Sequence, residues 1–143
     1  MDFEQTAHMA AYNTNLAGEF HVLSMLYRLG ANATLTLGNK KSVDIVVVRF
    51  AGDSITIDVK AIAGTTLWPL DNFRGGTERH FLVFVSFLGR IGNTDVLPDV
   101  YIVPSIEIEA LMYHAPGGKR KGMPLSALRR HGLRYRNAWE RLL

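Results

Sequence analysis

A carboxylate and an ammonium group stand two residues apart at Asp58 and Lys60, inside a run that is typical of a β-strand. Successive side chains of a strand point to opposite faces, so these two share one face while Ile57 and Val59 share the other. An acid and a lysine on an otherwise apolar sheet are costly to bury unless a partner compensates their charges. A divalent metal ion with its bound water would do so, which makes both residues candidates for metal-dependent hydrolysis.

Two further carboxylates precede this pair: Asp44 opens a β-rich run, and Glu19 lies within the apolar stripe of a helix. Together with Asp58 and Lys60 they suggest hydrolysis of a phosphodiester. Each also has an ordinary interpretation. Glu19 could reach water from the edge of its stripe, and Asp44 could bond a turn amide. Asp58 and Lys60 could lie on an exposed strand face and take part in a cross-strand ion pair. The residues alone leave both interpretations open.

The register of one hairpin decides whether Asp44 can join the other two strand residues. The β-rich runs 43–50 and 54–62 are separated by Ala51-Gly52-Asp53, which is typical of a hairpin loop. A three-residue loop would place Asp44 directly opposite Lys60. A loop of two or four residues would turn Asp44 to the other face unless a bulge intervened.

Hydrophobic periodicity predicts an α/β domain built around one mixed sheet of about five strands flanked by helices. The first helix is expected over 16–29, with Asn13 or Asn15 as its N-cap and Gly30 as its C-cap. Its apolar stripe is expected to consist of Leu16, Phe20, Leu23, Leu26 and Tyr27. The other expected elements are strands near 33–37, 43–50, 54–62, 80–88 and 100–103, a turn at 38–41, an irregular segment over 63–79 bordering the site, and short helices over 105–113 (capped by Ser105), 124–130 and 137–142.

Composition predicts one globular domain, because the 143 residues are 48% hydrophobic and 20% charged. The chain has no cysteine, which excludes disulfides and thiolate metal sites. Its five histidines show no spacing typical of metal ligands. Neither a transmembrane run nor a signal peptide is found, so we expect a soluble intracellular, cytoplasmic protein of prokaryotic or phage origin.

Basic charge is concentrated at the C-terminal end of the chain. Residues 1–113 hold eight Lys or Arg against twelve Asp or Glu, whereas 114–143 hold eight against one. Such segregation is typical of a nucleic-acid-facing surface, although a solvated basic tail would look the same. Tyr135 and Trp139 could stack on bases there, or Trp139 could belong to the core. The candidate phosphate contacts are Arg74, Arg79, Lys119, Arg120, Lys121, Arg129, Arg130, Arg134 and Arg136.

The order of a helical Glu19, a strand-opening Asp44 and the Asp58-x-Lys60 pair resembles the PD-(D/E)xK nuclease superfamily, which includes restriction endonucleases and archaeal Holliday-junction resolvases. Trp68 after the lysine and the late segment 101–104 fit the same resemblance, which covers roughly residues 14–104. One departure is Val43, which replaces the proline that names the motif.

The resemblance implies a restriction-endonuclease-like core and a Mg²⁺-dependent nuclease, with Mn²⁺ able to substitute. Asp44, Asp58 and the Val59 backbone carbonyl would hold the metal, and Lys60 would orient the attacking water or stabilise charge on the phosphorane. Glu19 would be an outer ligand or serve a second metal. DNA is favoured over RNA as the substrate, and a homodimer suits symmetric cutting. The alternative is a non-catalytic module that binds nucleic acid or protein and retains the nuclease fold.

Overall fold

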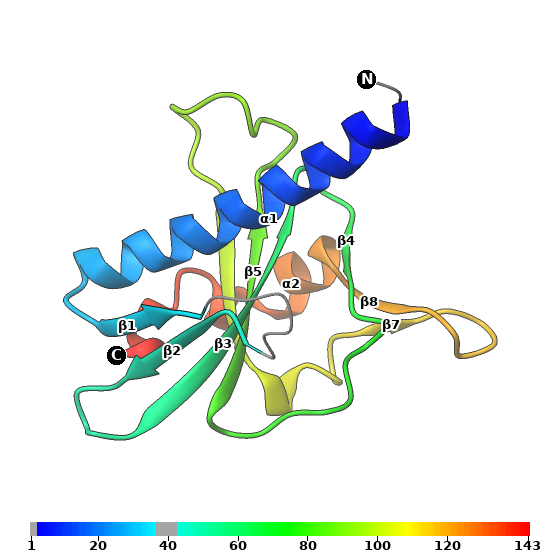
Figure 1. The fold of residues 1–143 in the computed structure, drawn as a ribbon. Coiled ribbons are helices and arrows are strands. Elements are labelled where there is room, and N and C mark those ends of the chain that lie inside the picture. Colours follow the sequence, from blue (N-terminus) through cyan, green and yellow to red (C-terminus); the bar gives the residue numbers. More distant parts are fainter. Residues whose placement is uncertain (1–2, 37–42) are drawn as a thin grey trace.

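A mixed five-stranded sheet forms the centre of the molecule, with strand order β1-β2-β3-β5-β6 (Figure 1). The structure is a computed structural model that describes residues 3–36 and 43–143, with the backbone alone for residues 3–8. The turn expected at 38–41 lies outside the described residues. Only β3 and β5 are parallel among these neighbours. The predicted α/β class and mixed sheet are therefore confirmed. The strands are β1 (Asn32–Leu35), β2 (Ile45–Val48), β3 (Ser54–Ile62), β5 (His80–Ser86) and β6 (Asp99–Pro104).

A second, three-stranded sheet was missed by the sequence analysis. It has the order β4-β8-β7, where β4 is Leu67–Pro69, β7 is Tyr113–His114 and β8 is Lys121–Pro124. β4 comes from the segment expected to be irregular, and β7 and β8 lie on either side of the loop that carries Lys119 and Arg120. These strands have little local signal because each is only two to four residues long, and β4 in addition pairs with β8 across more than 50 residues.

The helical elements after β6 match the prediction over 124–130 to within one residue but are shorter than predicted elsewhere. They are α2 (Leu125–His131) and the 3₁₀ turns η1 (Ser105–Glu107), η2 (Leu133–Tyr135) and η3 (Trp139–Leu142). The expected helix over 105–113 is wrong. Ser105 does not cap it, because its hydroxyl accepts a hydrogen bond from the Thr77 N–H (2.9 Å) and donates one to the Thr77 carbonyl (3.1 Å). Ser105 thereby fixes the loop before β5.

The first helix, α1, runs from Phe3 to Arg28 and begins well before the predicted Leu16. It crosses the sheet diagonally over β3 (Figure 1). The predicted core stripe is only partly correct: Leu26 is fully buried, but Phe20 is 53% and Tyr27 is 55% exposed. The helix instead turns Gly18 toward β3, where an added Cβ would lie 2.6 Å from the Ala61 Cβ. The absence of a side chain at Gly18 permits this close approach and sets which face of α1 is covered.

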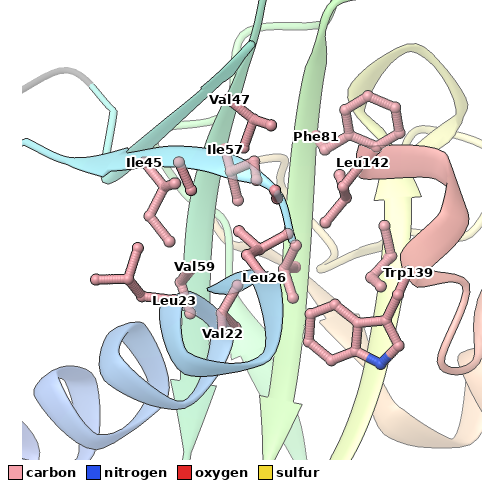
Figure 2. Close-up of a cluster of buried hydrophobic side chains, with 14 of the residues drawn as sticks. Val22, Leu23, Leu26, Ile45, Val47, Ile57, Val59, Phe81, Trp139 and Leu142 are labelled. Atoms are coloured by element: carbon pink, nitrogen blue, oxygen red, sulfur yellow. The ribbon is translucent and has the colours of Figure 1, made fainter. Parts of the chain in front are cut away.

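Two apolar clusters fill the two faces of the large sheet. The cluster under α1 includes Val22, Leu26, Ile57 and Val59, and it also contains Trp139 from η3 (Figure 2). This places Trp139 in the core, with 9% of its surface exposed, and so settles the alternative left open for it. The second half of α1 and the C-terminal turn η3 therefore share one core. The opposite cluster consists of Trp68, Leu70, Leu82, Phe84, Tyr101, Val103, Ile108, Met123, Leu125, Leu128 and Tyr135.

Replacing Gly18 by valine should lower the free energy of unfolding by about 1–3 kcal/mol, because the new side chain must push α1 away from Ala61. Ala10→Val is the matched control, since Ala10 is exposed on the same helix and valine should cost only about 0.5 kcal/mol of helix propensity there. Urea unfolding followed by circular dichroism measures both. Equal losses in the two variants would contradict the close-contact argument.

Candidate functional site

The β2–β3 hairpin has a longer loop than predicted. Val48 pairs with Ser54, so five residues separate the strands instead of three. The Arg49 N–H donates to the Asp53 carbonyl at 2.8 Å, and the Arg49 guanidinium pairs with the Asp53 carboxylate. That ion pair lowers the pKa of the Asp53 carboxyl. Because three and five are both odd, the longer loop preserves which face each strand residue occupies.

Asp44 is positioned by a break in the β2–β3 ladder. Ile45 pairs with Ile57, yet the Asp44 N–H also donates to the Ile57 carbonyl at 2.9 Å. Two residues of one strand therefore lie opposite one residue of the other, as in a β-bulge. The Asp44 carboxylate then accepts a hydrogen bond from the Val59 N–H, with Oδ2 2.7 Å from the nitrogen. The three-residue loop that would place Asp44 directly opposite Lys60 does not form, and Asp44 is instead hydrogen-bonded to Val59, the residue between Asp58 and Lys60.

The Val59 carbonyl shares this environment. In a strand, the N–H and C=O of one residue point to the same neighbouring strand, so the Val59 carbonyl points toward the side on which Asp44 lies. Within the described residues the β2–β3 ladder spans Ser54 to Ile57 and does not reach Val59. The site thus forms where β3 extends beyond the end of its pairing with β2.

A cavity of about 690 Å³ gathers the predicted residues from three elements. Glu19 enters it from α1, Asp44 from the start of β2, and Asp58 and Lys60 from β3. Glu19 is only 9% exposed. Val59 and Arg74 also line the cavity, whereas Arg79 does not. The four residues singled out from the sequence are therefore brought together around one cavity.

The sequence analysis missed His80. Its Nε2 lies 3.0 Å from Asp58 Oδ2, and both side chains are about a quarter exposed. The parallel pairing of β3 with β5 brings His80 opposite Thr56, two residues before Asp58 on the same face. Histidine spacing along the chain could not reveal this, because the partner lies on another strand. Asn15, which was expected as a possible N-cap, lies inside α1 because the helix begins at Phe3, and it also lines the cavity.

The donor atoms at this site suit a hard cation. Among the described residues there is no group of three or more His, Cys, Asp or Glu side chains placed to hold a metal ion. The Asp44 and Asp58 carboxylates line one cavity, and the Val59 backbone is hydrogen-bonded to Asp44. Mg²⁺ is commonly held by one or two carboxylates, with water and substrate phosphate completing its octahedron. The Asp44 and Asp58 carboxylates match this type and number of protein ligands.

One wall of the cavity is the segment Leu70–Gly75, here called the 70–75 strap. Lys121 of β8 ties it down: the Leu70 N–H donates to the Lys121 carbonyl (2.9 Å), and the Lys121 N–H donates to Asp71 Oδ1 (3.1 Å). The Lys121 ammonium donates to the Phe73 carbonyl and lies 5.9 Å from the centre of the Phe73 ring. Lys121 was predicted to contact phosphate; in the structure its backbone and its ammonium group hold the wall of the cavity.

Several of the predicted phosphate-binding arginines pair within the protein. Arg129 and Arg136 contact the Asp99 carboxylate at 3.6 and 3.2 Å. Arg134 lies over the Tyr135 ring, whose centre is 4.6 Å from its guanidinium carbon, and donates to the Tyr135 hydroxyl at 2.5 Å. Tyr135 itself is fully buried, so it is placed for packing and not for stacking on bases.

The loop between β7 and β8 carries the more accessible basic charge. Lys119 is exposed, and the Arg120 side chain is 78% exposed with a long 3.9 Å contact to Asp71 of the strap. Because β8 is hydrogen-bonded to the strap through Lys121, this loop is joined to the wall of the cavity. Besides Arg74, which lines the cavity itself, Lys119 and Arg120 are thus the predicted phosphate contacts coupled to the site through its wall.

Comparisons with protein-family models, with curated proteins and with solved structures found no match to this chain. In the part of the chain that the structure describes, no helix is long and apolar enough to cross a membrane. A fold by itself hosts many functions, so the argument for function is made from the geometry and chemistry of the cavity.

Replacing Lys121 by methionine should loosen the 70–75 strap, because methionine keeps much of the apolar stem but cannot donate to the Phe73 carbonyl. Amide hydrogen exchange of the strap should accelerate by roughly tenfold, the equivalent of one lost hydrogen bond of about 1.4 kcal/mol. Lys119→Met is the matched control and should leave the exchange unchanged. Unaltered exchange in Lys121→Met would show that the backbone bonds alone hold the strap.

Proposed function

We propose that this protein is a Mg²⁺-dependent nuclease of the PD-(D/E)xK type with a restriction-endonuclease-like core. The observation that carries the proposal is the convergence of Glu19, Asp44, Asp58 and Lys60 on one cavity. These residues are up to 41 positions apart in the sequence and come from α1, β2 and β3. A chance Asp-x-Lys pair on a strand would have no reason to face two further carboxylates from separate elements.

The oxygen donors provide the proposed metal position. Asp44 and Asp58, with the Val59 carbonyl, would hold Mg²⁺, and Mn²⁺ would substitute because it accepts the same hard ligands. The bound cation would polarise a phosphate oxygen and lower the pKa of a coordinated water. Glu19, which is nearly buried at the edge of the same cavity, would act as an outer ligand or serve a second cation.

The surrounding protein orients these donors. The Val59 N–H fixes one oxygen of Asp44, and His80 contacts one oxygen of Asp58. Ligands held in this way lose little freedom when a cation and a phosphate arrive. Lys60 lies on the same strand face as Asp58, where its ammonium would orient the attacking water or stabilise negative charge on the phosphorane.

DNA is the proposed substrate, and RNA remains the alternative for the same phosphodiester chemistry. Lys119 and Arg120 on the β7–β8 loop, with Arg74 at the cavity, would contact the backbone phosphates. A cavity with one cluster of catalytic residues cuts one strand at a time. A homodimer is therefore proposed for cleavage of both strands of a symmetric substrate.

The competing function is a module that binds nucleic acid or protein without cutting. It is favoured by one observation: the described residues contain no three-residue cluster that could hold a metal by itself. The two proposals differ in what Asp58 does. A nuclease loses cleavage but keeps binding when Asp58 is changed, whereas a binding module has no cleavage to lose.

Asp58→Asn and Lys60→Met should each reduce Mg²⁺-dependent cleavage by about 10²–10³-fold, because each removes a charge that acts on the transition state. Supercoiled plasmid, a four-way junction and single-stranded RNA are the substrates, each with Mg²⁺, Mn²⁺ or EDTA. Binding to the same substrates in Ca²⁺, measured by fluorescence anisotropy, should persist. Asp95→Asn, which changes an exposed loop residue, is the matched control.

Cleavage by the wild-type protein that is lost in EDTA and in both variants would support the nuclease. Intact substrates under every metal, with binding retained, would replace it by the binding module. Cleavage that survives Asp58→Asn would show that the chemistry lies elsewhere.

Double replacement Lys119→Ala/Arg120→Ala should reduce the slope of log binding constant against log salt concentration by about 2, since two phosphate contacts no longer release counterions. Arg129→Ala/Arg136→Ala removes the same charge but should change the slope much less, because both arginines pair with Asp99. Anisotropy titrations between 50 and 300 mM salt test this. Equal reductions in the two variants would assign binding to the general basic charge of the C-terminal segment.

A further inference from the structure

An apolar stripe lies exposed along α1, on a side of the helix that the sheet does not cover. Met9 is 50% exposed, Tyr12 60%, Phe20 53% and Tyr27 55%. Four large apolar side chains exposed to solvent on one helix are uncommon in a small domain. Such a patch usually marks an interaction surface. The sheet-facing side of α1 is distinct, since Val22, which is fully buried, lies two residues and about 200° beyond Phe20.

The spacing along this stripe indicates a helical partner. Met9, Leu16 and Leu23 follow one another at intervals of seven residues, and Phe20 and Tyr27 each lie four residues after Leu16 and Leu23. These are the a and d positions of a heptad pattern, which is the pattern of a helix that packs along another helix. Leu23 is already mostly buried, so it joins the stripe to the core and the remaining positions face outward.

The stripe is complementary to itself when two copies run antiparallel. Antiparallel helices pair a positions with d positions, which would bring Leu16 against Phe20 of a second copy and Met9 against Tyr27 of a second copy. Both pairings are symmetric about residue 18, so one two-fold axis satisfies them together. The only Asp, Glu, Lys or Arg residues between 9 and 28 are Glu19 and Arg28, and neither occupies a stripe position. Two copies can therefore approach without charge repulsion along the stripe.

We propose that α1 pairs antiparallel with α1 of a second copy of this chain, centred at residue 18. This inference rests on the exposed stripe and not on the proposed nuclease activity. The six aromatic side chains of the pair would bury on the order of 600 Å², given about 200 Å² for each and their exposed fractions. With Met9, Leu16 and the rim this approaches the lower limit of about 1,000 Å² for a specific interface, so the dimer should dissociate on dilution.

The pairing has a consequence for the cavity. Glu19 lies next to the centre of the proposed helix pair and lines the cavity from α1. The two cavities of the dimer would thus lie on either side of one two-fold axis and close to it, an arrangement suited to a two-fold symmetric ligand.

Sedimentation velocity over a hundredfold range of concentration tests the interface. The wild-type protein should shift from monomer to dimer, and Phe20→Glu should raise the apparent dissociation constant at least tenfold, because a charge would be buried without a partner. Ala10→Glu is the matched control: it adds the same charge to an exposed position about 80° from the stripe and should leave the association unchanged. A wild-type monomer at every concentration, or equal effects of both variants, would overturn the proposal.

Cysteine cross-linking tests the antiparallel register, and the natural absence of cysteine makes the assay specific. Under oxidation, Met9→Cys/Tyr27→Cys should form a covalent dimer in high yield. Met9→Cys alone should not, because residue 9 of each copy would lie about 27 Å from its counterpart at 1.5 Å per residue. Circular dichroism verifies that both variants fold. Cross-linking of Met9→Cys alone would indicate a parallel pair and overturn the proposal, as would the absence of a covalent dimer in the double variant.

Discussion

The hydrogen bond from the Val59 N–H to the Asp44 carboxylate is the interaction on which the site depends. It occurs where β2 departs from β3, so a side chain replaces the next step of the backbone ladder. The buried N–H of Val59 gains an acceptor, and Asp44 gains a fixed position. Asp58 and Lys60 flank Val59 along the strand, and the bond holds Asp44 on the cavity that both of them line. A β-bulge commonly redirects a side chain in this way next to a functional site.

The other elements can be understood as supports for this break in the sheet. Gly18 lets α1 approach β3 closely enough for Glu19, the next residue, to reach the cavity. On the opposite face, β8 and the 70–75 strap close the cavity through the bonds of Lys121. Both supports bring two backbone segments close together. Gly18 does so between α1 and β3, and the hydrogen bonds of Lys121 do so between β8 and the strap. Residues that take no part in the proposed catalysis, such as Gly18, therefore determine where the charged residues of the cavity lie.

The basic charge of the C-terminal segment shows how composition and structure differ in what they reveal. The segregation of charge is a property of the sequence, but its accessibility is not. Asp99 pairs with Arg129 and Arg136, although some 30 residues separate them, and Lys121 is used to hold the strap. Lys119 and Arg120 remain on an exposed loop. A count of basic residues therefore overstates the surface that is free to contact phosphate.

The sequence by itself determined the α/β class, the mixed sheet and four of the residues that line the cavity. Each of these follows from local information: alternation along strands, loop residues between them, and a charged residue placed where an apolar one is expected. Tertiary structure alone decided the bulge at Asp44, the contact of His80 with Asp58, the second sheet and the face of α1 that is covered. These depend on pairings between segments far apart in the chain, whose energies come from close packing and from hydrogen bonds that no local pattern encodes. Phe20 and Tyr27 are the plainest case. Helical periodicity predicted that both would be buried, yet both are exposed, because the sheet covers the side of α1 on which Gly18 contacts Ala61.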